Sequence, residues 1–458
     1  MAGRAGQLIV AGALLLGASV RLALLPLPGS PDMGPWKSWS FAASSDVTSI
    51  YGVGGNPPER RLIHWRGIQS TTEYPPLALY QLAVAGRVYA AIDPPYDDSP
   101  LLTSLVKAPG LVAELALVIA LLTSGRRALG EKPAVWTAVA IWLNPAVILN
   151  GAALGYLDAQ MAVPAVLALL AAAMGRPVIA GALLAAAILT KAQALFVAPV
   201  VLLAAIDFGR RHMESDDAKR NPRSVAKFLV GASATSAVIL LPIVLRGAWP
   251  SMVQAISRLA AHDMLSGNAL NAWWLVTWVV RAMYALDLGW FRAFTMPVRI
   301  LGRTRFMEIG FPDPKLIGTA IVLLLIVWRL WRSRMGQSLA SWAVTAGWCV
   351  FAYFMFGAQV HENHLYLAVP FFALAAGLDR RFRGPFYTIS AIVALNMYVF
   401  YGLSEGWPPL INRAWTVVDL TVVLSLISLG AFFWITAETV GPPPDARRWD
   451  VEEEQDYA

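Results

Sequence analysis

Apolar runs alternate with short polar stretches along nearly the whole chain. Many of these runs approach the ~20 residues that a helix needs to cross a bilayer. The pattern therefore predicts an all-α polytopic membrane protein. About twelve membrane-spanning helices are expected, near 7–27, 101–123, 134–150, 161–175, 177–190, 194–206, 225–245, 315–331, 338–356, 365–379, 385–403 and 415–437.

Clusters of arginine and lysine set the predicted orientation, because such clusters favour the cytoplasmic side. They occur at 126–132, 210–227, 329–334 and 380–383, and the polar tail from 441 is assigned to the same side. Both termini are then cytoplasmic, and two long loops, 28–100 and 246–314, are extracytoplasmic. Four outer arginines run against the rule, which governs long loops only weakly: Arg292, Arg299, Arg303 and Arg305.

Each long loop contains an apolar stretch that is predicted to lie along the membrane interface. The stretch at 77–92 includes Gly86 and Arg87, and the stretch at 270–287 is rich in tryptophan. A crossing by either would move the next basic cluster to the outside, so interfacial helices are expected. The catalytic transmembrane domain is placed at 1–440, with an uncleaved first helix, and 441–458 is expected to be a disordered cytoplasmic tail.

Composition agrees with this class. Of 458 residues, 57% are hydrophobic and 14% are charged, against about 25% charged in soluble domains. The net charge of +7 is attributed to topology and to contact with anionic membrane lipids, and no nucleic-acid partner is expected. The single cysteine, Cys349, excludes an intrachain disulfide and a cysteine-based metal site.

The polar motifs of the chain gather at helix ends that the charge count places outside. Polar residues collected at one level of a membrane protein indicate a single site, so a membrane enzyme with an extracytoplasmic active site is predicted. The candidate residues are Asp32, Tyr74, Tyr156, Asp158, Lys191, Gln193, His262, His361, Glu362 and His364.

Two of these candidates are acids next to predicted helices. Asp32 follows the first helix, and its spacing alone favours a cap for a helix that starts near Pro35; the alternative is a general base in the first outer loop. Asp158 is equally open to interpretation as a helix cap or as a site residue. Tyr74 precedes two prolines, which stiffen the turn and are typical of a helix start.

Lys191 is predicted at the turn of a short helical hairpin. A lysine at this depth must snorkel or be paired with an anion, either a carboxylate or a phosphate. His361 and His364 lie at the outer start of a late helix. A metal site is considered but not favoured, because no third ligand is apparent; the alternative is that both histidines and Glu362 bind a phosphate or a sugar.

No phosphate loop and no dinucleotide-binding glycine motif occurs in the sequence. A nucleoside triphosphate or a sugar nucleotide in a Rossmann-type site is therefore not expected as the substrate, and no cofactor is predicted.

The order of the motifs resembles that of a known family. An acid after the first helix is followed by Tyr74-Pro75-Pro76-Leu77, Asn144-Pro145, a Gly-aromatic-x-Asp segment, Lys-x-Gln and His-Glu-x-His. This order is similar to the integral-membrane GT-C glycosyltransferases, specifically the prokaryotic relatives of the GPI second-mannose transferase. A more distant likeness extends to the dolichol-linked oligosaccharide glucosyltransferases, which also carry a Tyr-Pro-Pro-Leu turn.

The resemblance implies a GT-C fold and a set of roles. Asp32 corresponds to the acid of the family's first loop and would be the general base. Lys191, His361 and His364 would contact the phosphate or the leaving group, while Tyr74, Asp158 and Gln193 would line the sugar and acceptor pockets. The implied partners are a polyprenyl-phosphate sugar donor and a lipid- or glycan-linked acceptor in a bacterial plasma membrane.

The sequence departs from the family pattern in two places. Tyr156 stands where members usually have glutamine, and the first motif has one acid instead of an Asp-x-Asp pair. The first departure bears on the sugar contacts, and the second argues against an obligatory metal. The reaction expected is an inverting hexosyl transfer, with mannose as the expected sugar; a lipid or glycan transporter or flippase is the alternative, followed by a structural membrane subunit.

Overall fold

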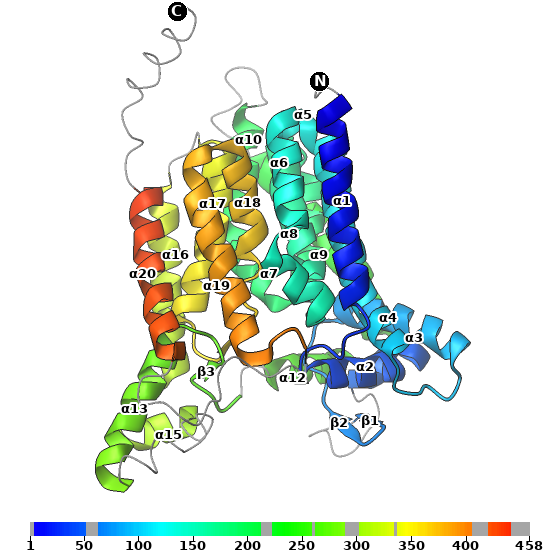
Figure 1. Ribbon diagram of the computed structural model, residues 1–458, viewed down its shortest axis with the longest axis vertical. Coiled ribbons are helices and arrows are strands. Elements are labelled where there is room, and N and C mark those ends of the chain that lie inside the picture. Colours follow the sequence, from blue (N-terminus) through cyan, green and yellow to red (C-terminus); the bar gives the residue numbers. More distant parts are fainter. Residues whose placement is uncertain are drawn as a thin grey trace, which may run out of the picture.

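The computed structural model describes residues 4–51, 63–211, 222–258, 262–288, 302–333, 337–404 and 420–440. In this part of the chain the long helices stand side by side as a bundle (Figure 1), and shorter elements collect below its lower end. The predicted tail at 441–458, together with Arg292 and Arg299, lies outside the described residues.

A helix occurs at each predicted span. The helices of the bundle are α1 (Arg4–Leu24), α4 (Pro100–Ala120), α6 (Glu131–Trp142), α7 (Pro145–Ile148), α8 (Asp158–Ala173), α9 (Pro177–Thr190), α10 (Ala198–Arg211), α11 (Pro222–Leu245), α16 (Pro314–Arg332), α17 (Leu339–Phe356), α18 (Ala368–Leu378), α19 (Arg383–Tyr401) and α20 (Leu420–Val440).

Seven helical stretches among the described residues are long and apolar enough to cross a membrane, and an eighth is added if α6 and the segment 145–153, bent by 46°, count as one span. Four further apolar helices, α8, α9, α18 and α3 (Pro76–Ile92), are shorter. The chain is therefore a polytopic helical membrane protein, and the number twelve stays a prediction.

The two predicted outer loops supply the elements below the bundle (Figure 1). The first loop forms α2 (Met33–Ser45), α3 and an antiparallel pair of strands, β1 (Ile63–Trp65) and β2 (Ile68–Ser70). The second forms α12 (Trp249–Ser257), α13 (Ala272–Leu288) and α15 (Arg303–Glu308). Its short strand β3 (Ser266–Gly267) pairs in parallel with β4 (Val360–His361) and so fastens this loop to the late histidine motif.

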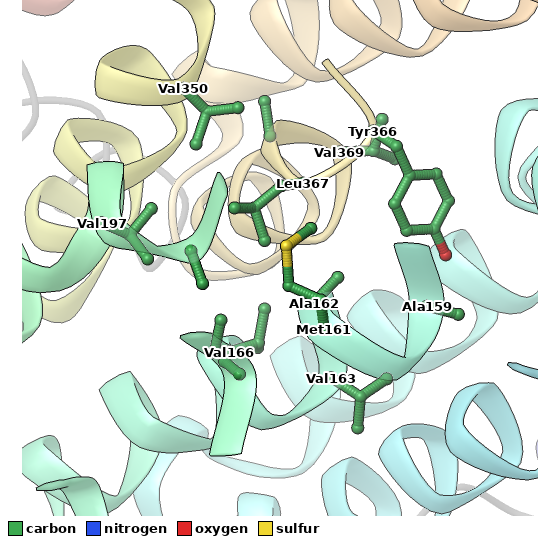
Figure 2. Close-up of a cluster of buried hydrophobic side chains, with 14 of the residues drawn as sticks. Ala159, Met161, Ala162, Val163, Val166, Val197, Val350, Tyr366, Leu367 and Val369 are labelled. Atoms are coloured by element: carbon green, nitrogen blue, oxygen red, sulfur yellow. The ribbon is translucent and has the colours of Figure 1, made fainter. Parts of the chain in front are cut away.

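A dense apolar core supports the elements that carry the site. Met161 and Val166 of α8, Val197 of the 3-10 helix η4 (Ala192–Val197), Val350 of α17 and Leu367 meet there (Figure 2). These five side chains are at most 1% exposed. Such close packing holds α8, η4 and the segment before α18 in a fixed arrangement.

Buried hydrogen bonds attach the first helix, α1, to two neighbouring helices. Arg21 of α1 donates from Nε to Glu114 of α4 at 2.7 Å and from Nη1 to the carbonyl of Trp142 in α6 at 2.7 Å. The Arg21 side chain is fully buried and that of Glu114 is 3% exposed. A buried charge pair of this kind is costly to break. The end of α1 is therefore held in place, and with it the start of the loop that contains Asp32.

Candidate active site

A cavity of about 790 Å³ lies at the lower end of the bundle, between the first outer loop, η4, α16 and the segment before α18. Seven of the ten candidate residues line it: Asp32, Tyr74, Lys191, Gln193, His262, His361 and His364. The other three, Tyr156, Asp158 and Glu362, lie behind the lining: Tyr156 is hydrogen-bonded to Glu362, and Asp158 to Lys191 of the lining. Motifs up to 332 positions apart in sequence therefore share one site.

The loop that carries Asp32 is held from behind by a lysine of α4. Lys107 Nζ donates to the carbonyls of Leu27 at 2.7 Å, Ala152 at 3.1 Å and Ala153 at 2.8 Å. The amide of Ser30 donates to the carbonyl of Leu154 at 2.9 Å. These bonds join the Asp32 loop to the segment that leads to Tyr156, so the two motifs keep a fixed spacing.

Asp32 occupies the N-cap position of α2 without capping it. Its side chain makes no hydrogen bond to the amides of the helix, so the capping interpretation of this residue is wrong. The carboxylate instead lines the cavity. Desolvation by the surrounding protein, followed by the negative charge of Glu362, raises the pKa of Asp32 above its ordinary value. A carboxylate of raised pKa facing a cavity has the properties of a general base.

Asp158 is the most heavily bonded acid of the site. Its Oδ1 accepts from Lys191 Nζ at 2.5 Å, and its Oδ2 accepts from Asn150 at 2.9 Å and from Asn363 at 2.8 Å. The residue is 1% exposed. The anion that Lys191 requires is thus a carboxylate within the protein, and Asp158 links α8 to the end of α9 and to the late histidine motif. It does not cap α8.

Tyr156 and Glu362 form a second buried pair. The Tyr156 hydroxyl donates to Glu362 Oε1 at 2.5 Å, and the Tyr156 ring packs edge-on against Trp36 at 5.7 Å between centroids. Among the described residues, Glu362 Oε2 has no hydrogen-bond partner. Burial is the main cause that raises the pKa of Glu362 to about 7.

His364 is embedded in a network of hydrogen-bonding groups. Its Nδ1 lies 3.0 Å from the Tyr353 hydroxyl and accepts from the amide of His361 at 3.3 Å. Its Nε2 lies 2.8 Å from Gln193 Nε2. Burial lowers the pKa of His364 well below its ordinary value, so the ring is neutral.

His361 lies in β4, where it is positioned against the second outer loop. Its ring is 6.3 Å from that of His262, whose Nε2 in turn lies 3.1 Å from Glu73 Oε2. Burial lowers the pKa of His361 to about 4, so it is neutral at physiological pH. The motif 361–364 precedes α18, which begins only at Ala368; the expectation that the histidines occupy a helix N-terminus is therefore wrong.

Tyr74, from the first outer loop, forms part of the cavity wall. The helix α3 begins at Pro76, so the Tyr-Pro-Pro-Leu turn is a helix start as its prolines indicate. The Tyr74 ring packs on Trp39 at 5.4 Å, and Lys191 Nζ lies 5.7 Å from its centroid. Burial raises the pKa of Tyr74 to about 12, so the hydroxyl stays protonated and is available as a donor.

The cavity continues into an apolar end that the sequence did not predict. Successive turns of α16 contribute Lys315, Thr319, Val322, Leu323 and Ile326 along one side. Leu195, Phe196 and Pro199 of η4 and α10 face them from the other side. The spacing of the α16 residues follows the helical repeat, which was the only signal for this wall in the sequence.

The polar end contains further residues that sequence reasoning missed. Gln69, Ser70, Thr71 and Glu73 line it from the strand pair side, and Gln359 from the segment before β4. Arg258 Nη2 donates to the Thr72 carbonyl at 3.0 Å and so joins the two outer loops beside the cavity. Within the described ranges, no three histidine, cysteine or acidic residues come together as metal ligands would.

The upright helices and the carboxylate-bearing cavity at their end define a polytopic membrane protein with a polar site at one end of its bundle. Residues 68–434 match the family described as the ALG6, ALG8 glycosyltransferase family. Because this match covers most of the chain, the protein belongs to that family and is a membrane glycosyltransferase of the GT-C superfamily. The resemblance to the GT-C glycosyltransferases that the order of the motifs indicated is thereby confirmed; the match is to the ALG6, ALG8 family and does not single out the relatives of the GPI second-mannose transferase.

Solved structures give a weaker likeness. The apo oligosaccharyltransferase of Archaeoglobus fulgidus superimposes with a TM-score of 0.41 at 15% identity, over 96% of this chain and 57% of that one. The oligosaccharyltransferase AglB of the same organism, in complex with an inhibitory peptide and a dolichol-phosphate, gives 0.41 at 15% identity, over 97% and 57%. This chain thus spans somewhat more than half the length of those proteins. No curated protein matches its sequence.

Proposed function

We propose that the protein transfers a hexose, with mannose as the expected sugar, from a polyprenyl-phosphate donor to a hydroxyl of a lipid- or glycan-linked acceptor. The transfer takes place on the extracytoplasmic face, with both termini in the cytoplasm, and inverts the anomeric carbon. Membership of a glycosyltransferase family favours this reaction over transport of a lipid or glycan. The transmembrane catalytic domain at 1–440 is part of the same proposal.

The observation that carries the proposal is the state of Asp32. Among the described residues, none donates a hydrogen bond to its side chain, and the carboxylate faces the cavity. Asp32 accepts the proton of the acceptor hydroxyl while that oxygen forms a bond to the anomeric carbon. The bond from this carbon to the phosphate oxygen breaks, and the phosphate leaves with the electron pair. Attack from the face opposite the phosphate gives inversion.

The two ends of the cavity fit the two parts of the donor. The apolar side chains of α16 and η4 form a track for an isoprenoid chain, and Lys315 stands at the head of this track. Lys191 lies on the same lining with His361 and His364. The phosphate is placed between these groups, where cations and N–H donors stabilise the charge that develops on the leaving group.

The sugar and the acceptor occupy the polar end. Tyr74 and Gln193 line it directly, with Asp158, Tyr156 and Glu362 behind them, and His262 closes it from the second outer loop. Hydroxyl groups of a sugar find both donors and acceptors on this surface. The basic clusters support the extracytoplasmic placement of the site, since Arg126 and Lys132 lie at the opposite end of the helices and such residues favour the cytoplasmic side.

A transfer assay tests the proposal. Purified protein in lipid receives radiolabelled polyprenyl-phosphate mannose, glucose or arabinose with a membrane extract as acceptor. Wild-type protein is expected to move label from one donor into a new product, with mannose the expected one, and Asp32→Asn is expected to abolish the transfer. Asp97→Asn is the matched control, because this exposed acid of the same loop pairs with Arg66 away from the cavity.

Absence of transfer from all three donors by protein that retains its wild-type melting temperature would contradict the proposal. Substantial transfer by Asp32→Asn would remove Asp32 as the base. Transfer of glucose or arabinose in place of mannose would keep the reaction and correct the sugar.

A further inference from the structure

A second, larger cavity lies at the end of the bundle away from Asp32. It is a groove of about 1210 Å³ between α1, α6 and α19, hereafter the α1–α6–α19 groove. Its mouth is near Gln7, Arg126 and Lys132, and its inner end is near Leu14, Leu143 and Ala394. None of the residues assigned to the candidate active site lines it.

The walls of this groove are apolar and wide. Ile9 and Leu14 come from α1, Val135 and Val139 from α6, and Phe386 from α19. Small residues on the three helices keep the space open: Gly6, Ala11, Ala140, Ala391 and Ala394. Water has few polar partners on such a surface, so the groove suits a hydrocarbon chain.

The groove is open to the bilayer. Only 11% of the apolar stretch of α1 is buried inside the protein, and Leu8 and Ile9 are each 72% exposed. In a membrane this helix is surrounded by lipid along most of its length. A lipid chain therefore reaches the groove sideways, without passing through the protein.

The polar groups at the inner end already have partners. Asn144 Nδ2 donates to Ser390 Oγ at 2.8 Å, its Oδ1 accepts from the amide of Ala146 at 2.9 Å, and Ser390 Oγ donates to the Phe386 carbonyl at 2.8 Å. The inner end therefore offers no unpaired polar group to a ligand. A polar part of a ligand would bind at the mouth of the groove.

The mouth carries an excess of positive charge. Arg126 and Lys132 line it, and within the described part of the chain neither forms an ion pair with another residue. Arg383 adds a third cation: its guanidinium lies 5.0 Å from the ring of Trp136, which lines the groove, and its Nε is buried without a described hydrogen-bond partner. Glu131 is the one acid on the lining, and it has an interaction of its own.

From these observations we propose that the α1–α6–α19 groove is a binding site for an anionic glycerophospholipid of the bilayer. One acyl chain lies along Val135, Val139 and Leu14, and the phosphate is held by Arg126 and Lys132, with Arg383 beside them. Basic residues at a membrane surface attract anionic lipid headgroups. The site is independent of the proposed transfer reaction.

Native mass spectrometry of the full-length protein tests this site. Protein in detergent is titrated with palmitoyl-oleoyl phosphatidylglycerol or with the neutral palmitoyl-oleoyl phosphatidylcholine. Wild-type protein is expected to retain one phosphatidylglycerol at least tenfold more tightly than phosphatidylcholine. The double variant R126Q/K132Q is expected to lose about tenfold of that preference, since two cations are removed.

Two controls separate a site from general attraction to lipid. R176Q/R210Q removes the same charge from exposed arginines at the same end of the bundle, outside the groove, and should retain the wild-type preference. Ala391→Trp fills the groove and should weaken both lipids, whereas Leu8→Trp on the lipid-facing side of α1 should weaken neither. The Trp pair keeps the test valid if a charge variant fails to fold.

Equal loss of phosphatidylglycerol in R126Q/K132Q and R176Q/R210Q would overturn the proposal, as would wild-type retention in Ala391→Trp. Displacement of phosphatidylglycerol by an equimolar polyprenyl phosphate would overturn the choice of a glycerophospholipid.

Discussion

Asp32 and Asp158 belong to one polar cluster but are in opposite states. Asp158 accepts hydrogen bonds from Lys191, Asn150 and Asn363 and is 1% exposed. Asp32 lines the cavity, and none of the described residues donates to its side chain. Both acids lie at the start of a helix, and neither caps it.

This difference indicates a structural role for Asp158 and a reactive role for Asp32. Three donors stabilise the charge of Asp158, and its bonds hold three segments together. Asp32 has no such donors, and its side chain is exposed to the cavity. Desolvation by the cavity walls and the charge of Glu362 raise its pKa, so it can accept a proton from a substrate. Removing Asp158 should therefore damage the structure, while removing Asp32 should damage only the reaction.

The largest expected effect on stability is that of Asp158→Asn. The change leaves the ammonium of Lys191 buried without its counter-charge, which costs about 3–5 kcal/mol. Thermal unfolding in lipid nanodiscs measures it as a fall in melting temperature. The double variant D158N/K191M removes both charges and should recover part of the loss. Equal melting temperatures for Asp158→Asn and the exposed Asp97→Asn would show that the pair is not structural.

The next effect is a pH dependence set by Glu362. Its pKa rises from 4.5 to about 7 in the folded protein, so the folded state binds more protons between these values. Glu362 therefore contributes stability that is fully present below pH 4.5 and is lost as the pH rises to about 7, on the order of 1–3 kcal/mol. Glu362→Gln should flatten this part of the curve of melting temperature against pH. An unchanged slope would contradict the buried, protonated state.

If Asp32 is the base, the rate of transfer should fall at low pH. The base acts only when it is deprotonated, and its pKa is raised above 3.8. Below that pKa, kcat/KM should fall about tenfold per pH unit, with a midpoint above that of an ordinary aspartate. A pH profile measured with saturating acceptor gives the midpoint. A rate that is independent of pH down to 4 would argue against Asp32 as the base.

The smallest effect comes from the contact between the outer loop and His361. A Cβ at Gly267 would lie 2.7 Å from His361 Nδ1, so Gly267→Ala must displace this ring within the cavity. A several-fold rise in the KM for the donor is expected, with kcat reduced less. Gly430→Ala in α20 meets no neighbour within 4 Å and serves as control; the same KM in both variants would show that His361 does not contact the donor.

The sequence predicted the helices well, because hydrophobic length is a strong signal in membrane proteins. The predicted span at 177–190 coincides with α9, and the interfacial stretch at 77–92 corresponds to α3. The number of membrane-spanning helices was harder to predict, since α8, α9 and α18 are shorter than a full span. Packing inside the protein, at positions such as Val197 and Leu367, stabilises these short helices, and hydropathy does not measure such packing.

The sequence identified the residues of the site but not the contacts between them. The motifs indicated Lys191 and Asp158 separately, but their pairing depends on how α8 and α9 turn towards each other. The positions of Lys315 and Gln359 on the cavity wall gave no signal, because a polar residue near a helix end is common. The helix start after His364 was misplaced for a related reason: residues 362–367 form turns that satisfy one another locally.

The most direct test is to measure the transfer rate and the melting temperature of Asp32→Asn beside those of Asp158→Asn. The account predicts that Asp32→Asn lowers the rate by about 10²–10⁴-fold and keeps the melting temperature, because the exposed Asp32 side chain makes no hydrogen bond with the described residues. Asp158→Asn should lower the melting temperature as well as the rate. An Asp32→Asn protein that transfers sugar at the wild-type rate, or that unfolds as readily as Asp158→Asn, would contradict the division between a reactive and a structural acid.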